Sequence, residues 1–242
     1  MILTAVLLSC AVLSAQEAIP EPQPPEPALT QPVVPAAPAV TTQPAKKDAL
    51  LLYNQGRKAE TAGQLAEASA RYREAIAVCD AEIATDPYRM DAHTVKCWSL
   101  FRLKSYKDVV NVGTASLRLR FDARIVECMG EAYYFLGDNQ NALRSFQRYV
   151  DNVGEFADRV STAYFYMAES YMRLKRFDHA DIAYGLAVHR EPTMARWWYR
   201  YGNAVEALGE YPRAYELYGR ALKLSPDMQE AQTAQTRVRG LY

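Results

Sequence analysis

Side chains that could carry out catalysis or bind a metal are few in this 242-residue chain and lie far apart. None of its three histidines lies at metal-ligand spacing from another candidate ligand. Beyond residue 50 there are three cysteines, Cys79, Cys97 and Cys128, and they form no C-x-x-C pair. The sequence also lacks H-E-x-x-H, G-x-S-x-G and phosphate-binding glycine motifs. We therefore expect no enzyme, no metal site and no cofactor.

Charge and composition limit the other classes of function. The chain has 28 basic and 28 acidic residues and is 50% hydrophobic, so it is expected to fold. Residues 45–242 carry 28 basic and 25 acidic side chains. This excess is too small for the basic stripe that a nucleic-acid-binding surface requires.

The first fifteen residues form an uncharged, largely apolar run, which is shorter than the roughly 20 residues of a membrane-spanning helix. We interpret residues 1–15 as an export signal. Two processing sites remain open: cleavage after Ala15, or a lipobox that ends at Cys10 and would make this cysteine a lipidation site. No Lys or Arg precedes the apolar run, although export signals normally begin with a basic region, and this weakens both interpretations. A third alternative is that the segment is neither kind of signal. Either signal would place the protein in the periplasm or the cell envelope.

Residues 16–47 are rich in proline, alanine and glutamine, and contain nine of the 13 prolines but no aromatic residue. Such a segment cannot bury a hydrophobic core and is typical of a polyproline II spacer. A role as a proline-rich ligand is the alternative. The folded domain is expected to cover residues 48–242.

The remainder contains repeats of 34 residues. Residues 161–194 align without a gap with residues 195–228. The recurring side chains of the second unit are Trp198, Tyr201, Gly202, Val205, Leu208, Gly209, Tyr211, Ala214, Tyr218, Ala221 and Pro226. Residues 123–156 and 49–82 keep much of the same pattern.

This spacing resembles the tetratricopeptide repeat, which has Trp, Leu-Gly, Tyr, Ala, Phe, Ala and Pro in that order. The resemblance implies an all-α fold, an α-α superhelix of helix-turn-helix units. We expect five repeats, near residues 49–82, 90–122, 123–156, 161–194 and 195–228, and a capping segment over residues 229–242. The register of the second repeat stays open, because Lys96 replaces an apolar residue and Gly113 replaces the large aromatic one.

The positions of small side chains support this alignment independently. The two helices of a unit can approach closely only where the side chains that face each other are small. Gly56, Cys97, Gly130, Ala168 and Gly202 are expected to face small residues of the second helices. Cys97 and Cys128 occupy such small-residue positions, so buried thiols are favoured over a disulfide. The second helix of the first unit is expected to run on to Ile83.

The resemblance also implies a concave face lined by the first helices, at repeat positions 2, 5, 9, 12 and 13. Aromatic residues and arginine at these positions are typical of binding hot spots. The candidate partner-binding residues are Tyr53, Arg57, Trp98, Phe101, Arg102, Glu131, Tyr134, Phe135, Phe165, Glu169, Met172, Arg173, Arg196, Tyr199 and Asn203. Packing between neighbouring repeats is the alternative for each aromatic residue, above all for Phe101 and Phe135.

Some members of the family hold a partner's C-terminal carboxylate with a clamp of basic and amide side chains. Arg196, Arg200 and Asn203 resemble part of that clamp, and Arg200 joins the candidate partner-binding residues. The rest is absent, since Tyr166 stands where Asn would be expected, and Glu127 and Glu131 stand where basic or neutral polar residues would be. The sequence therefore predicts no clamp of this kind, and pairing of Arg196 and Arg200 with an acidic patch or carboxylate is the alternative that stays open.

The resulting hypothesis is a non-catalytic, protein-binding scaffold of the cell envelope that holds a peptide or helix of another protein in its concave face. Two alternatives remain open: a structural subunit of a larger envelope or motor assembly, and a periplasmic accessory protein of a transporter. The sequence predicts membrane contact only through a lipid at Cys10, and it leaves the oligomeric state open.

Overall fold

The computed structural model describes residues 48–154 and 157–242, and these residues form eleven α-helices and no strand. The expected all-α repeat fold is thus confirmed. The processing sites at Cys10 and Ala15 and the proline-rich segment lie outside the described residues. The helices are α1 (Ala49–Thr61), α2 (Leu65–Thr85), α3 (Met90–Arg102), α4 (Tyr106–Leu119), α5 (Ala123–Leu136), α6 (Asn139–Asn152), α7 (Val160–Arg173), α8 (Phe177–Arg190), α9 (Ala195–Ala207), α10 (Tyr211–Leu224) and α11 (Gln229–Arg239).

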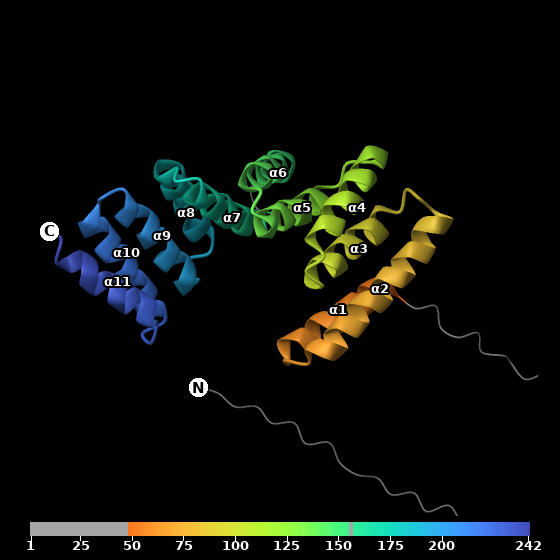
Figure 1. Cartoon of the computed structure of the whole chain (residues 1–242), viewed down its shortest axis with the longest axis horizontal. Helices are drawn as coiled ribbons and strands as arrows, with labels where there is room; N and C mark the ends of the chain where they lie inside the picture. The colour runs from red at the N-terminus through yellow and green to blue at the C-terminus, as the bar shows by residue number, and fades with distance from the viewer. Residues whose placement is uncertain (1–47, 155–156) are drawn as a thin grey trace, which may run out of the picture. The chain divides into compact units, whose positions relative to one another are not determined.

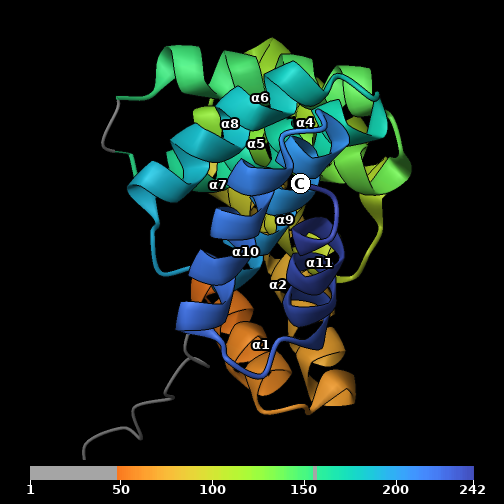
Figure 2. The ribbon, with the colours of Figure 1, turned by 90° about the vertical axis from the view of Figure 1, so that its left-hand side faces the viewer.

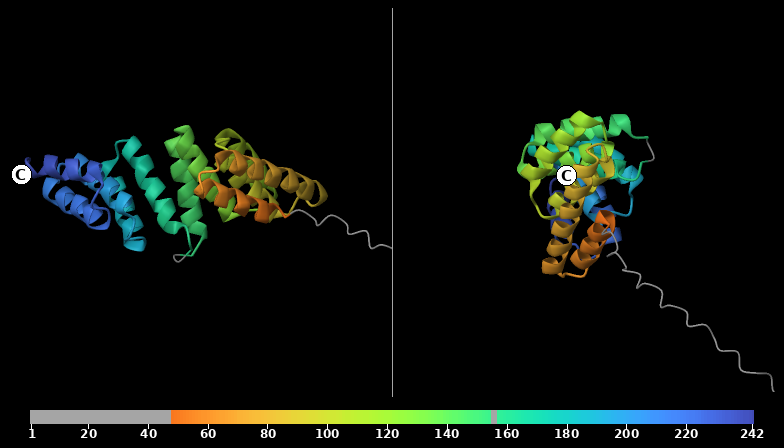
Figure 3. Two further views of the ribbon diagram at one scale, coloured as in Figure 1. Left: turned by 90° about the horizontal axis from the view of Figure 1, so that it is seen from below. Right: turned by 90° about the vertical axis from the view of Figure 1, so that its right-hand side faces the viewer.

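The helices pack in consecutive pairs, from α1 with α2 to α9 with α10, and each pair packs against the next (Figure 1). The first two helices and α11 lie at opposite ends of the array (Figure 3), which Figure 2 views from the end that carries α11. The expected capping segment is α11, whose Ala231, Ala234 and Val238 are buried against the last pair. Of the helices described, none is long and apolar enough to cross a lipid bilayer.

The turns inside the pairs follow from local sequence. Gly137 and Gly209 end the first helices of the third and fifth pairs with φ of 82° and 80°, where a side chain would be strained. Lys104 and Lys175 adopt the same left-handed conformation in the second and fourth pairs. Asp138 then accepts a hydrogen bond from the Asn141 backbone N–H and caps α6.

The second repeat has the register that begins at Met90, and tertiary contacts explain its two unusual residues. A Cβ on Gly113 would lie 2.5 Å from the sulfur of Met129, so this methionine fills the space left by the missing aromatic ring. Lys96 extends to Asp80, with an Nζ–Oδ1 distance of 2.5 Å. Asp80 lies on α2, which is seven residues longer than the 14-residue α4, and its extension was expected from the sequence.

The recurring aromatic residues of the second helices pack over the small residues of their own pairs. Rings of Tyr72, Phe146 and Tyr218 occupy the space above Gly56, Gly130 and Gly202, respectively. Phe146 also packs against the following repeat, because its ring stacks on Tyr166 with centroids 5.7 Å apart. Among the described residues, Cys79, Cys97 and Cys128 are buried free thiols, as expected for Cys97 and Cys128. Burial raises the pKa of Cys79 and of Cys97 to about 12, so these thiols stay protonated at neutral pH.

Alanine at Gly202 is expected to destabilise the fifth pair. A Cβ there would lie 2.4 Å from Tyr218, which cannot swing away because its hydroxyl donates to Asn203 Oδ1. The matched control is Gly219→Ala, where the added Cβ would meet only the flexible end of Gln235. Both changes replace glycine with alanine inside a helix and gain the same helix propensity. We therefore expect the free energy of unfolding of Gly202→Ala, measured with urea, to be about 1–3 kcal/mol lower than that of Gly219→Ala. Equal stability of the two variants would contradict this packing.

Candidate functional site

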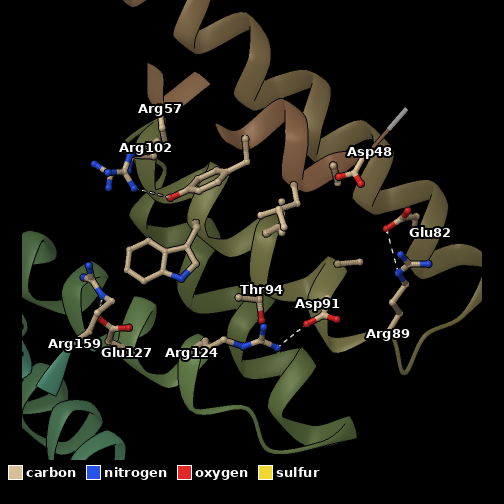
Figure 4. A pocket seen from close by; sticks show the side chains of 16 residues that line it. Asp48, Arg57, Glu82, Arg89, Asp91, Thr94, Arg102, Arg124, Glu127 and Arg159 are labelled. Atoms are coloured by element: carbon tan, nitrogen blue, oxygen red, sulfur yellow. Dashed lines mark hydrogen bonds and ion pairs between the residues drawn. The ribbon is translucent and has the colours of Figure 1, made fainter. Parts of the chain in front are cut away.

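A pocket of about 490 Å³ lies over the first helices of the first three pairs, α1, α3 and α5 (Figure 4). We call it the α1/α3/α5 pocket. Its lining residues include Tyr53, Arg57, Trp98, Arg102, Glu127 and Arg159. The first four are residues that the repeat positions predicted, so the structure brings them together in one pocket.

Five arginines line this pocket, and several of them are paired with carboxylates. Arg89 lies 3.3 Å from Glu82, and Arg124 lies 2.8 Å from Asp91 (Figure 4). Arg102 is 3.8 Å from Glu60 and hydrogen-bonds to the Tyr53 hydroxyl. The pocket is therefore lined by charged side chains of both signs as well as by apolar side chains.

Two buried carboxylates of α5 share one arginine at the end of this pocket. Glu127 and Glu131 are 3% and 4% exposed, and both accept hydrogen bonds from Arg159, which precedes α7. The pKa of Glu127 is raised to about 7, mainly by burial and also by the charge of Glu131, while Arg159 opposes the rise. The guanidinium of Arg159 also lies over the Trp98 ring, 5.0 Å from its centroid.

The predicted groove aromatics are joined by ring contacts that cross four pairs. Trp98 contacts Phe101, which contacts Phe135, with centroid distances of 5.5 and 5.7 Å. Phe165 stacks on Trp197 at 4.9 Å. Of these residues, Phe101 is buried and Phe135 is 46% exposed. The alternative weighed for Phe101, packing between repeats, thus describes its position, whereas Phe135 presents much of its ring to solvent.

Glu169 has a structural environment that differs from the partner-binding role expected for it. It is 5% exposed and accepts hydrogen bonds from the hydroxyls of Tyr134 and Tyr184. Arg200 donates to it from Nε and Nη2, at 2.6 and 2.5 Å. Glu169, Tyr134 and Arg200 therefore bind one another across three pairs. This corrects the expectation that they face a partner, because their polar groups satisfy each other inside the array.

The other predicted residues lie beyond the α1/α3/α5 pocket. Arg173 is exposed, stacks on the Tyr134 ring and donates to the backbone oxygen of that residue at 2.6 Å. Asn203 Oδ1 accepts a hydrogen bond from the Tyr218 hydroxyl, and Arg196 lies 3.9 Å from Glu230. Met172 and Tyr199 are half-buried. The structure thus does not bring Arg196, Arg200 and Asn203 together as a clamp with free charges, because Arg200 and Asn203 are already hydrogen-bonded.

Some residues of the pocket were not predicted from the repeat positions. Arg159 lies in the inserted segment between α6 and α7, to which no repeat position corresponds. Arg124 stands at position 2 of the third repeat, so the spacing held a signal for it. Thr94 stands at position 5 of the second repeat and was likewise not singled out.

Two segments of the chain match family models described as tetratricopeptide repeat, over residues 195–228 and residues 129–154. No curated protein matches the sequence. Among solved structures, a double mutant of MamA RS-1 aligns with a TM-score of 0.60 at 17% identity, covering 76% of this chain and 99% of that chain. A structure of MamA AMB-1 aligns with a TM-score of 0.56 at 15% identity, over 72% and 98% of the two chains.

The crystal structure of YrrB, described as a TPR protein with an unusual peptide-binding site, is a further similar structure. Its TM-score is 0.55 at 19% identity, and the alignment covers 79% of this chain and 94% of that chain. At these identities the likeness shows the fold. The two family matches identify residues 129–154 and 195–228 as tetratricopeptide repeats.

Proposed function

We propose that this protein is a non-catalytic scaffold that binds a peptide or helix of another protein in the α1/α3/α5 pocket. The observation that carries the proposal is the pocket itself, where Tyr53, Trp98 and several arginines from successive pairs line one volume of about 490 Å³. Aromatic and arginine side chains in a concave site are the residue types that supply most binding energy in protein interfaces. YrrB, which has the same fold, is described as having a peptide-binding site.

The proposal places the scaffold in the cell envelope. Its support is the apolar run of residues 1–15 and the proline-rich segment of residues 16–47, both outside the described residues. Processing at Cys10 would attach the protein to a membrane by a lipid, and processing after Ala15 would release it into the periplasm.

Site-specific photocrosslinking in the native host tests both parts of the proposal. A benzophenone amino acid replaces Leu50, which lines the pocket and is 54% exposed. The matched control carries it at Ile182 of α8, which is 66% exposed and lies outside the pocket lining. We expect a covalent adduct with one envelope protein from the Leu50 position and none from the Ile182 position. Identical adducts from both positions, no adduct at all, or an adduct only with cytosolic proteins would contradict the proposal.

A further inference from the structure

The carboxylates Glu127 and Glu131 and the guanidinium of Arg159 form a charge cluster at one end of the α1/α3/α5 pocket. The carboxylates are four residues apart on α5, which places them on one face of the helix. Their side chains are 3% and 6% exposed, whereas that of Arg159 is 42% exposed. With both carboxylates ionised, the cluster has a net charge of −1. The carboxylates then neutralise the positive charge that Arg159 would otherwise present to a ligand in the pocket.

The groups that face this cluster come from every helix packed against α5. They are Arg102 of α3, Tyr106 of α4, Tyr149 of α6 and Tyr166 of α7, with Asp158 beside Arg159. Arg102 and Arg159 are the cations, and both favour ionised Glu131. Burial acts in the opposite direction and raises the pKa of each carboxyl group, that of Glu127 to about 7. A proton therefore leaves Glu127 as the pH rises through neutrality, and the net charge of the cluster falls by one.

Elsewhere in the pocket, donors exceed the acceptors that the described residues offer them. Arg102 Nε and Thr94 Oγ1 are buried and have no hydrogen-bond partner among those residues. Arg57 has the Tyr53 hydroxyl as a partner at 3.5 Å, and no carboxylate of the described residues lies within ion-pair distance of it. Buried donors without acceptors are costly, and a carboxylate offers acceptor oxygens together with the charge that complements arginine.

From this arrangement we infer that the α1/α3/α5 pocket binds a carboxylate-bearing segment of the partner protein, and that protonation of Glu127 strengthens the binding. The neutral carboxyl releases Arg159 from one of its two ion pairs, so the positive charge of this side chain acts on the ligand. Ligand carboxylates stay ionised at the same pH because they are solvated before binding. The ligand chemistry rests on the proposed function, whereas the proton uptake by Glu127 does not depend on a partner.

The proton uptake is tested on the free protein by NMR. Trp98 lies under the Arg159 guanidinium, so its indole N–H resonance reports the change in the cluster. Between pH 5.5 and 8.5 we expect this resonance to shift with a midpoint near 7. Glu127→Gln should abolish the midpoint, while Asp181→Asn, which alters the separate ion pair with Arg213, should retain it. A midpoint that survives in Glu127→Gln belongs to another group and overturns the inference; so does the absence of any midpoint.

The ligand chemistry is tested with two labelled peptides, hexaglutamate and the matched hexaglutamine, by fluorescence anisotropy. We expect hexaglutamate to bind about three- to tenfold more tightly at pH 6 than at pH 8, as for the change of one partly screened charge. Glu127→Gln should bind it with the pH 6 affinity at both pH values, and Arg57→Gln should bind it more weakly at both.

Equal binding of hexaglutamine, or no binding of hexaglutamate, would overturn the carboxylate preference. The photocrosslink from Leu50 would then still decide the scaffold function independently. A pH effect of equal size in wild type and Glu127→Gln would overturn the coupling alone.

Discussion

Replacing Phe146 with alanine is expected to lower the free energy of unfolding by about 3–5 kcal/mol, the usual loss for a buried aromatic ring. The Phe146 ring is fully buried, covers Gly130 and stacks on Tyr166 of the following pair. Its removal leaves a cavity at the junction of α5, α6 and α7, which neighbouring rings cannot fill without leaving their own contacts. Urea unfolding followed by circular dichroism measures the loss.

The matched control for Phe146→Ala is Phe135→Ala, on the first helix of the same pair. Phe135 is 46% exposed, and its main ring contact is a stacking on Tyr106 with centroids 5.1 Å apart. We expect this variant to lose about 1 kcal/mol, as for a partly exposed aromatic contact. If both variants lost the same free energy, Phe135 would belong to the core and could not serve as an exposed contact for a partner.

Replacing Glu169 with alanine is expected to cost about 2–4 kcal/mol of stability. This change removes the acceptor of Tyr134, Tyr184 and Arg200 at once, and removing one partner of a buried ion pair is strongly destabilising. We place the loss toward the lower end because the Arg200 side chain is 34% exposed, so water replaces part of the lost interaction. Urea unfolding of the single variants and of Glu169→Ala/Arg200→Ala forms a double-mutant cycle, and we expect a coupling energy above about 1 kcal/mol.

Glu230→Ala is the control for this cycle. Glu230 lies 3.9 Å from Arg196, and the two side chains are 55% and 71% exposed. Exposed ion pairs contribute little, so we expect a change within about 0.5 kcal/mol. Additive losses in the Glu169 and Arg200 variants would show that the ion pair between α7 and α9 contributes no coupling energy to the array.

The positions of the helices were determined by the sequence, because each depends on contacts between residues near in the chain. The 34-residue spacing predicted the five pairs, and the small residues Gly56, Gly130 and Gly202 predicted where the two helices of a pair approach. The long α2 and the terminal α11 followed from runs of helical residues. The thiols were expected to be buried for the same reason, since Cys97 and Cys128 stand at small-residue positions.

Contacts between repeats were decided only by the tertiary structure. The repeat positions indicated that Glu169 and Arg200 lie on first helices, but not that these two charges, 31 positions apart in the chain, meet in the fold. Arg159 enters the pocket from an inserted segment, and Met129 fills the space beside Gly113 from the next pair. The physical reason is that a repeat pattern specifies the face on which a side chain lies, whereas its partner depends on the rotation and offset of the neighbouring pair. Those are set by the packing of all the side chains between them.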